Sequence, residues 1–150
     1  MRVDFYQLSR DPVERTIPLL ASKVKAAGER LLIVSDDEAQ LRTVSDALWA
    51  DRPSEFLANG LAGEGHEARQ PILLSHLCEA LNGARMVMLA DGLWRAEVLP
   101  ENGGAFDRVM LMFDDARIEG ARACWRELGA HPELERHFWR QEDGRWNKAG

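Results

Sequence analysis

The chain has 150 residues, 45% of them hydrophobic, and a formal net charge of −6. This length fits one domain with a core of its own, and the charge excludes nucleic-acid binding driven by the protein's overall electrostatics. The charge is uneven, because residues 117–150 carry seven Lys or Arg against six Asp or Glu and the acidic excess lies before them. We therefore expect an anionic partner to bind near the C-terminal end.

The two cysteines, Cys78 and Cys124, lie far apart and have no CxxC spacing. This pattern indicates neither a disulfide framework nor a zinc site, and it favours a reducing cytoplasm. The N-terminal residues lack the apolar stretch of a signal peptide, and no apolar run approaches the roughly 20 residues that cross a membrane. The expected location is cytoplasmic, without a membrane partner.

The first elements along the chain alternate between strand and helix. Residues 3–8 alternate apolar and polar side chains, which predicts a strand. Asp11 followed by Pro12 predicts the start of a helix, with Asp11 as its cap, and Gly28 predicts its end. The apolar run at residues 31–34 is typical of a strand buried on both faces.

A second helix is expected directly after that strand. Ser35 and Glu38 have the spacing of a capping box, and the helix that follows carries Leu48 and Trp49. Strands and helices that alternate with short connections predict a parallel sheet with right-handed crossovers.

The middle of the chain is less regular. Residues 51–70 show no periodic pattern, whereas 72–74 and 86–90 are short apolar runs that predict strands. A short helical stretch is expected at residues 76–81, and residues 91–105 support no assignment.

The last third returns to clear patterns. Residues 109–113 predict a buried strand, and Asp114 predicts the cap of a helix from about residue 116 to about residue 129. Residues 137–148 predict a hairpin or extended tail. We expect one α/β domain over residues 1–150.

The glycine-rich segment between Gly60 and Gly65 is a candidate phosphate loop. It lacks the Lys-Ser/Thr pair of a P-loop, does not directly join a strand to a helix, and contains the anion Glu64. A turn in which glycine permits positive φ is the better interpretation.

Asp36 and Asp37 follow a predicted strand, at the edge where α/β proteins place their sites. With a further carboxylate from Asp91 or Asp114 they could hold magnesium, as in a receiver-like domain or a phosphotransfer enzyme. The competing interpretation is that these residues only cap helices and form turns. The magnesium site is kept as the alternative hypothesis.

Other catalytic patterns are missing from the sequence. No two of the four histidines have HxxxH or HExxH spacing, and no serine lies in a GxSxG turn. We therefore expect no catalytic residue, no cofactor, no bound metal and no small-molecule substrate.

Arg122, Trp125 and Arg126 are more informative. Positions 122 and 126 lie one helical turn apart, with 125 beside both, so two guanidinium groups flank an indole. With Arg117 at the start of the helix and Leu111 on the preceding strand, they suit an acidic peptide that ends in a carboxylate. The alternative is a solvated helix face with Trp125 packed inward.

Leu48, Trp49 and Phe56 bracket the loop after the second helix. They are either ordinary core residues or an exposed apolar patch for a protein partner, in which aromatic residues are enriched. Residue types alone do not decide between these.

Residues 46–65, DALWADRPSEFLANGLAGEG, resemble the best-known stretch of the chi subunit family of the bacterial DNA polymerase III holoenzyme. The family shows ALW, then a proline, a turn with phenylalanine, and LAGE. The opening Asp4-Phe5-Tyr6 and the Trp-rich tail around residues 138–146 are also similar to the family.

This resemblance implies a Rossmann-like α/β fold with a mostly parallel central sheet, helices on both faces and no working nucleotide site. It implies a non-catalytic accessory subunit that links the clamp loader, through the psi subunit, to single-stranded-DNA-binding protein and so only indirectly to DNA. The acidic tail of that protein ends in a phenylalanine carboxylate.

By the same resemblance, Arg122, Trp125 and Arg126 grip the tail, with Arg117 assisting and Leu111 lining the apolar slot. Trp49 and Phe56, beside Leu48, fall where the family meets psi. Two positions depart from the family pattern. Ile118 stands where a basic residue is common, and Ala58-Asn59 where a histidine is common.

Overall fold

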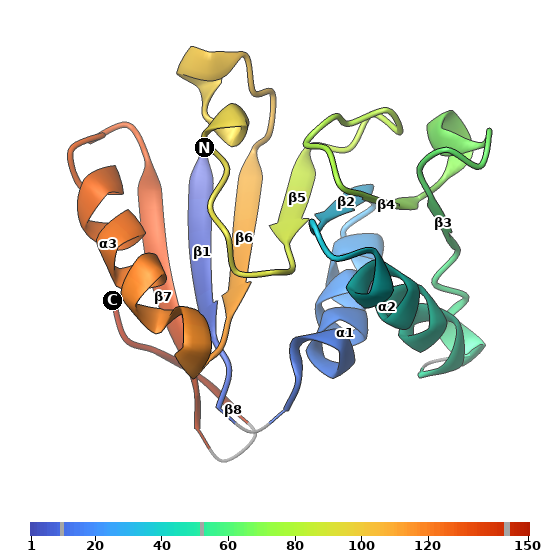
Figure 1. Cartoon of the computed structure of the whole chain (residues 1–150), viewed down its shortest axis with the longest axis horizontal. Helices are drawn as coiled ribbons and strands as arrows, with labels where there is room; N and C mark the ends of the chain where they lie inside the picture. Colours follow the sequence, from blue (N-terminus) through green and yellow to red (C-terminus); the bar gives the residue numbers. More distant parts are fainter. Residues whose placement is uncertain (10, 52, 143–144) are drawn as a thin grey trace.

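A computed structural model describes residues 1–9, 11–51, 53–142 and 145–150. Its main elements follow in chain order: β1 Arg2–Gln7, α1 Val13–Ala26, β2 Leu31–Val34, α2 Glu38–Ala50, β3 Asn59–Leu61, β4 Ile72–Ser75, β5 Met86–Leu89, β6 Arg108–Phe113, α3 Ile118–Leu128, β7 Glu135–Glu142 and β8 Arg145–Lys148 (Figure 1).

The strands form one sheet in the order β3-β4-β2-β5-β6-β1-β7-β8. Every neighbouring pair is parallel except β7 and β8, which form an antiparallel hairpin at one edge. The predicted α/β class with a mostly parallel sheet is therefore confirmed.

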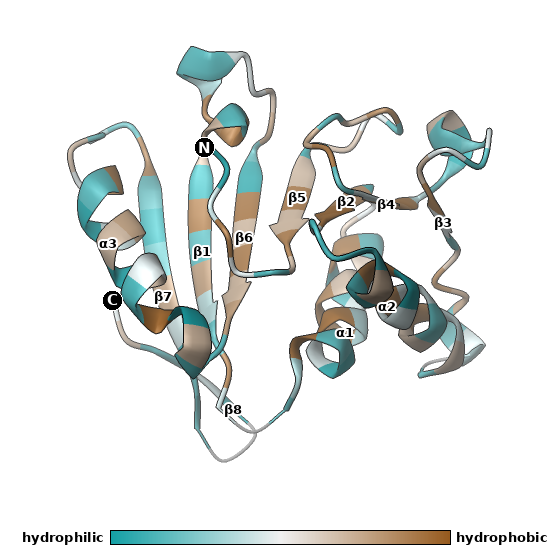
Figure 2. Ribbon diagram, in the orientation of Figure 1, coloured by the Kyte–Doolittle hydropathy of each residue, from teal (hydrophilic) through white to brown (hydrophobic). Residues whose placement is uncertain are grey.

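Helices cover both faces of this sheet, each over a separate apolar layer. Side chains of α1 and α2, among them Ile17 and Val44, pack on one face in a cluster that includes Ile33. Side chains of α3, among them Cys124 and Leu128, belong to the cluster on the other face. Brown, hydrophobic residues predominate on the inner strands β2, β4 and β5, whereas the edge strand β7 is largely teal (Figure 2).

Two of the predicted helix starts are wrong in detail. The N-cap of α1 is Pro12 rather than Asp11, because the Asp11 carboxylate accepts a hydrogen bond from the Gln141 side chain at 3.0 Å. The N-cap of α2 is Asp37, whose carboxylate accepts from the backbone N–H groups of Ala39 and Gln40.

Ser35 therefore forms no capping box with Glu38. Its hydroxyl lies 2.6 Å from the Gln40 side-chain oxygen, to which it donates. The short strand β3 within residues 51–70 is missing from the sequence prediction, and residues 76–81 are irregular instead of forming the expected helix. Residues 91–105 contain two 3-10 turns, at 96–98 and 100–102.

The remaining predictions match closely. Gly63 and Gly65 have φ of 94° and 89°, as expected for a shaped turn. A 3-10 turn at residues 115–117, capped by Asp114, precedes α3. The expected hairpin is present, although its turn at 143–144 lies outside the described residues. No helix in the described ranges is long and apolar enough to cross a membrane.

Candidate functional site

A cavity of about 300 Å³ lies between α3 and β7, and it brings together three residues singled out in the sequence, Arg122, Trp125 and Arg126. Strand pairing adds residues that are distant in the chain, because Gln7 on β1 is in register with Arg140 on β7. The rest of the lining comes from Gln7, Phe138, Arg140, Ala149 and Gly150.

Trp125 forms the half-buried apolar wall of this cavity. Its ring meets those of Phe5 and Phe138 edge to face, with centroids 5.2 and 5.6 Å apart. The Arg136 guanidinium carbon lies 4.2 Å from the centre of the Trp125 ring, and that side chain also donates to the Trp125 carbonyl. Such contacts hold the indole in one orientation beside the cavity.

Three guanidinium groups, from Arg122, Arg126 and Arg140, surround the cavity, and none of its described lining residues is acidic. Arg122 pairs with Glu119 at 3.2 Å, a contact between exposed groups that contributes little stability. Within the described residues Arg126 has no ion-pair partner. A ligand carboxylate could therefore accept hydrogen bonds from guanidinium groups that need not give up a strong internal partner.

The structure separates two predicted residues from this cavity. Leu111 is only 1% exposed and lies inside the core, so it cannot line a surface slot. Its expected place is taken by Phe138 and by the Trp125 ring. Arg117 lines a different cavity, beside Asp114 and Pro12, because the 3-10 turn carries it to the end of β6.

Residues 149–150 continue the β8 edge and form one side of the cavity. The Ala149 N–H donates to the Phe138 carbonyl at 2.7 Å, and the Phe138 N–H donates to the Gly150 carbonyl at 3.1 Å. A β-carbon on Gly150 would lie 3.4 Å from the Trp125 ring. Sequence reasoning missed this wall and Arg140, since both depend on the register of the hairpin.

A second set of candidate residues lies at the end of α2. Trp49 is 52% exposed and Phe56 is 75% exposed, so neither is an ordinary core residue and both are accessible to a partner. Leu48 is fully buried in the α1–α2 layer and therefore cannot contact a partner.

Phe56 is also held in a strained backbone conformation. Its φ is +49°, and no other described residue except glycines has a positive φ. The side chain of Lys25, on α1, donates to the Glu55 and Phe56 carbonyls, and Ser22 bonds to the Glu55 carboxylate. An exposed aromatic fixed in a strained position by its surroundings is a feature of binding sites.

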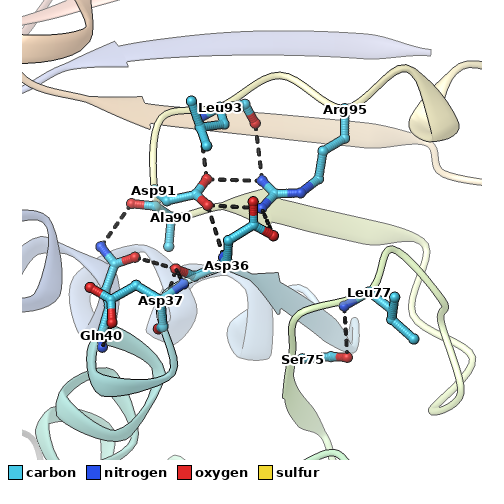
Figure 3. A network of polar contacts seen from close by, with 10 residues as sticks. Asp36, Asp37, Gln40, Ser75, Leu77, Ala90, Asp91, Leu93 and Arg95 are labelled. Carbon is cyan, nitrogen blue, oxygen red and sulfur yellow. Dashed lines mark hydrogen bonds and ion pairs between the residues drawn. The ribbon is translucent and has the colours of Figure 1, made fainter.

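The acidic residues after β2 form a network closed by Arg95 (Figure 3). The Arg95 guanidinium donates to both oxygens of Asp91, at 2.9 and 2.8 Å, and lies 3.0 Å from Asp36. Burial alone would raise the pKa of Asp91, but hydrogen bonds from Arg95 and from the backbone N–H groups of Asp36 and Leu93 outweigh it and lower the pKa.

This network argues against the alternative magnesium site. An arginine occupies the position between Asp36 and Asp91, while Asp37 and Asp114 serve as caps. Over the described ranges, no three His, Cys, Asp or Glu side chains gather closely enough to hold a metal ion. The interpretation of these residues as caps and turns therefore agrees with the structure.

Comparison with known proteins places these features in a family. The family model described as "DNA polymerase III chi subunit, HolC" matches residues 1–144. The curated protein "DNA polymerase III subunit chi" of Escherichia coli (strain K12) is 33% identical over 75 residues, which cover 45% of this chain. That match spans about half, 51%, of the relative's length.

Proposed function

This chain belongs to the DNA polymerase III chi subunit family, and we propose that it is a non-catalytic adaptor of the holoenzyme, without a substrate or cofactor of its own. In this proposal it binds the acidic tail of single-stranded-DNA-binding protein at one surface and the clamp loader at another. In this role it reaches DNA indirectly, through that first partner.

The observation that carries the proposal is the cavity between α3 and β7. Three guanidinium groups and a fixed indole surround it, so an anionic group and an apolar side chain can be held side by side. A tail that ends in phenylalanine offers both, because its ring can pack on Trp125 while its carboxylate pairs with Arg126. The acidic residues before it would lie near Arg122 and Arg140.

The second surface suits the clamp-loader subunit psi, where that subunit is present. Trp49 and Phe56 supply the aromatic anchors that dominate many interfaces. Trp49 lies in the last turn of α2 and Phe56 in the loop that leads to β3, near the β3–β4 edge of the sheet, whereas the cavity lies at the β7–β8 edge. The separation visible in Figure 1 supports simultaneous binding of both partners.

The cytoplasm is the proposed location. Both thiols are free, with Cys124 buried and Cys78 half-buried, and a reducing compartment keeps such thiols unpaired.

The test is a titration of a fluorescent acidic peptide that ends in phenylalanine, followed by anisotropy. Arg126→Ala should weaken binding about tenfold or more, since a hydrogen bond to a charged group contributes about 1.5–3 kcal/mol. Added salt should weaken it further. The same peptide with an amidated C-terminus should lose affinity comparably and should respond little to Arg126→Ala.

Arg42→Ala is the matched control, because Arg42 is an exposed helical arginine with a single i,i+4 partner, Glu38, away from the cavity. It should leave the affinity within about twofold of the wild type. Equal affinities for the Arg126→Ala variant and the wild type would contradict the proposed site.

A further inference from the structure

A second cavity, of about 200 Å³, lies on the opposite face of the same sheet edge. Alternate residues of β7 point to opposite faces, so Phe138 and Arg140 line the peptide cavity while Trp139 lines this one. The floor of the second cavity belongs to the α1 layer and includes Leu20 and Met110. The two cavities are therefore physically separate sites.

The walls of this cavity are aromatic. Tyr6 stacks on Trp139 with ring centroids 6.4 Å apart and an angle of 14° between their planes, and it meets Trp146 edge to face at 5.1 Å. Both indoles remain partly exposed, whereas Tyr6 is buried beneath them. A planar ring from a ligand could stack against such a surface.

The remaining lining is cationic. Arg2, Lys23 and Arg108 border the cavity, and none of its described lining residues is acidic. Two anionic side chains lie near the cavity. Asp4 is fully buried beneath the two arginines, and Glu135, which pairs with His137, is opposite Arg2 in the β1–β7 register. The cations lining the cavity still outnumber these anions, in a protein whose overall charge is negative.

Asp4 fixes the positions of the arginines. Its carboxylate accepts from Arg108 at 2.6 Å, from Arg2 at 3.1 Å and from the Trp139 indole at 3.0 Å. Arg108 also donates to the Tyr6 hydroxyl at 2.7 Å. Since a guanidinium has five N–H donors, these contacts leave others that can meet a ligand. The cations are therefore held in place before any ligand arrives.

We propose that this cavity binds one nucleotide of a single-stranded nucleic acid, with the base against Trp146 and Trp139 and a phosphate against Lys23 and the two arginines. Aromatic platforms beside cations are the usual means of holding single strands without sequence preference. This site would contact the single strand directly, and it is independent of the proposed peptide binding.

The experiment measures anisotropy of a labelled oligothymidylate of about 20 nucleotides with the full chain, at about 20 mM salt where phosphate contacts are strongest. Trp146→Ala should weaken binding at least about fivefold, and Trp146→Phe should restore most of it, because stacking needs an aromatic ring. Lys23→Glu, a change on an exposed helix position, should weaken binding by a similar factor.

Arg15→Glu is the matched control, since it makes the same charge change on the same helix outside the cavity. The Arg15→Glu variant should bind the oligothymidylate more tightly than the Lys23→Glu variant does. No binding at low salt, equal losses for the two charge reversals, or equally tight binding of duplex or of free thymidine monophosphate would overturn the proposal. So would a loss of acidic-peptide binding in Trp146→Ala, because the cavity would then be part of the peptide site.

Discussion

Replacing Arg95 with alanine should destabilise the fold by about 3 kcal/mol at neutral pH, because it leaves a buried carboxylate without its counterion. The Asp91 and Arg95 side chains are each only 10% exposed, and two hydrogen bonds join them. Removing one partner of a buried pair costs about 3–5 kcal/mol. The lower end applies because Asp91 keeps the backbone donors Asp36 and Leu93.

Loss of the Asp36 contact adds little, since that side chain is 67% exposed. Urea unfolding measures the effect, and the melting temperature should fall by about 6–12 °C for a chain of this size. Arg42→Ala serves again as a control and should cost less than about 0.5 kcal/mol, because its ion pair is exposed.

The effect should depend on pH. In the wild type the folded-state pKa of Asp91 is lowered, so its ionised form contributes stability above the unfolded pKa and this contribution is lost as the pH falls. Arg95→Ala removes the strongest of the hydrogen bonds that lower the pKa of Asp91, so protonation of Asp91 at low pH costs the variant less stability than it costs the wild type. The difference between the proteins should therefore shrink from pH 7 to pH 3. A loss below about 1 kcal/mol at pH 7, or an equal loss at both pH values, would refute this reasoning.

Three further outcomes are expected. Phe56→Gly should raise the free energy of unfolding, measured by urea titration, by up to about 1 kcal/mol, because glycine adopts the positive φ without strain. The same variant should no longer capture the clamp-loader partner, and a variant less stable than the wild type would contradict the idea that Phe56 is strained. Burial raises the pKa of Cys78 to about 11 and that of Cys124 to about 12. At pH 8, iodoacetamide should therefore alkylate both thiols far more slowly in the folded protein than in urea, as measured by mass spectrometry, and equal rates would contradict their burial. Millimolar Mg²⁺ should shift the melting temperature by less than about 1 °C, and a larger rise would revive the magnesium hypothesis.

The sheet was predictable where strands are buried on both faces. Residues 31–34 and 109–113 are continuous apolar runs, and both are strands. The three residues of β3 contain a glycine and a buried asparagine, so they show no such pattern. The cap of α2 was misassigned because the Ser35 hydroxyl, which could have capped the helix, bonds to the Gln40 side chain instead.

The candidate site was predictable only where one helix sets the spacing. Arg122, Trp125 and Arg126 share a face of α3, and the structure brings them to one cavity. Leu111 was misplaced because a strand's sequence does not show whether a helix covers it. The place of Arg140 depends on the pairing of β7 with β1, which spans most of the chain, and that of Gly150 depends on how β8 and the residues after it pair with β7.

The most direct measurement follows the indole N–H signals of the five tryptophans by NMR while the acidic peptide is added. We expect a large shift for Trp125, which lines the peptide cavity, and no shift for Trp49 and Trp146. Arg126→Ala should abolish that shift at the same peptide concentration. A peptide that moves Trp49 or Trp146 and leaves Trp125 in place would contradict the account.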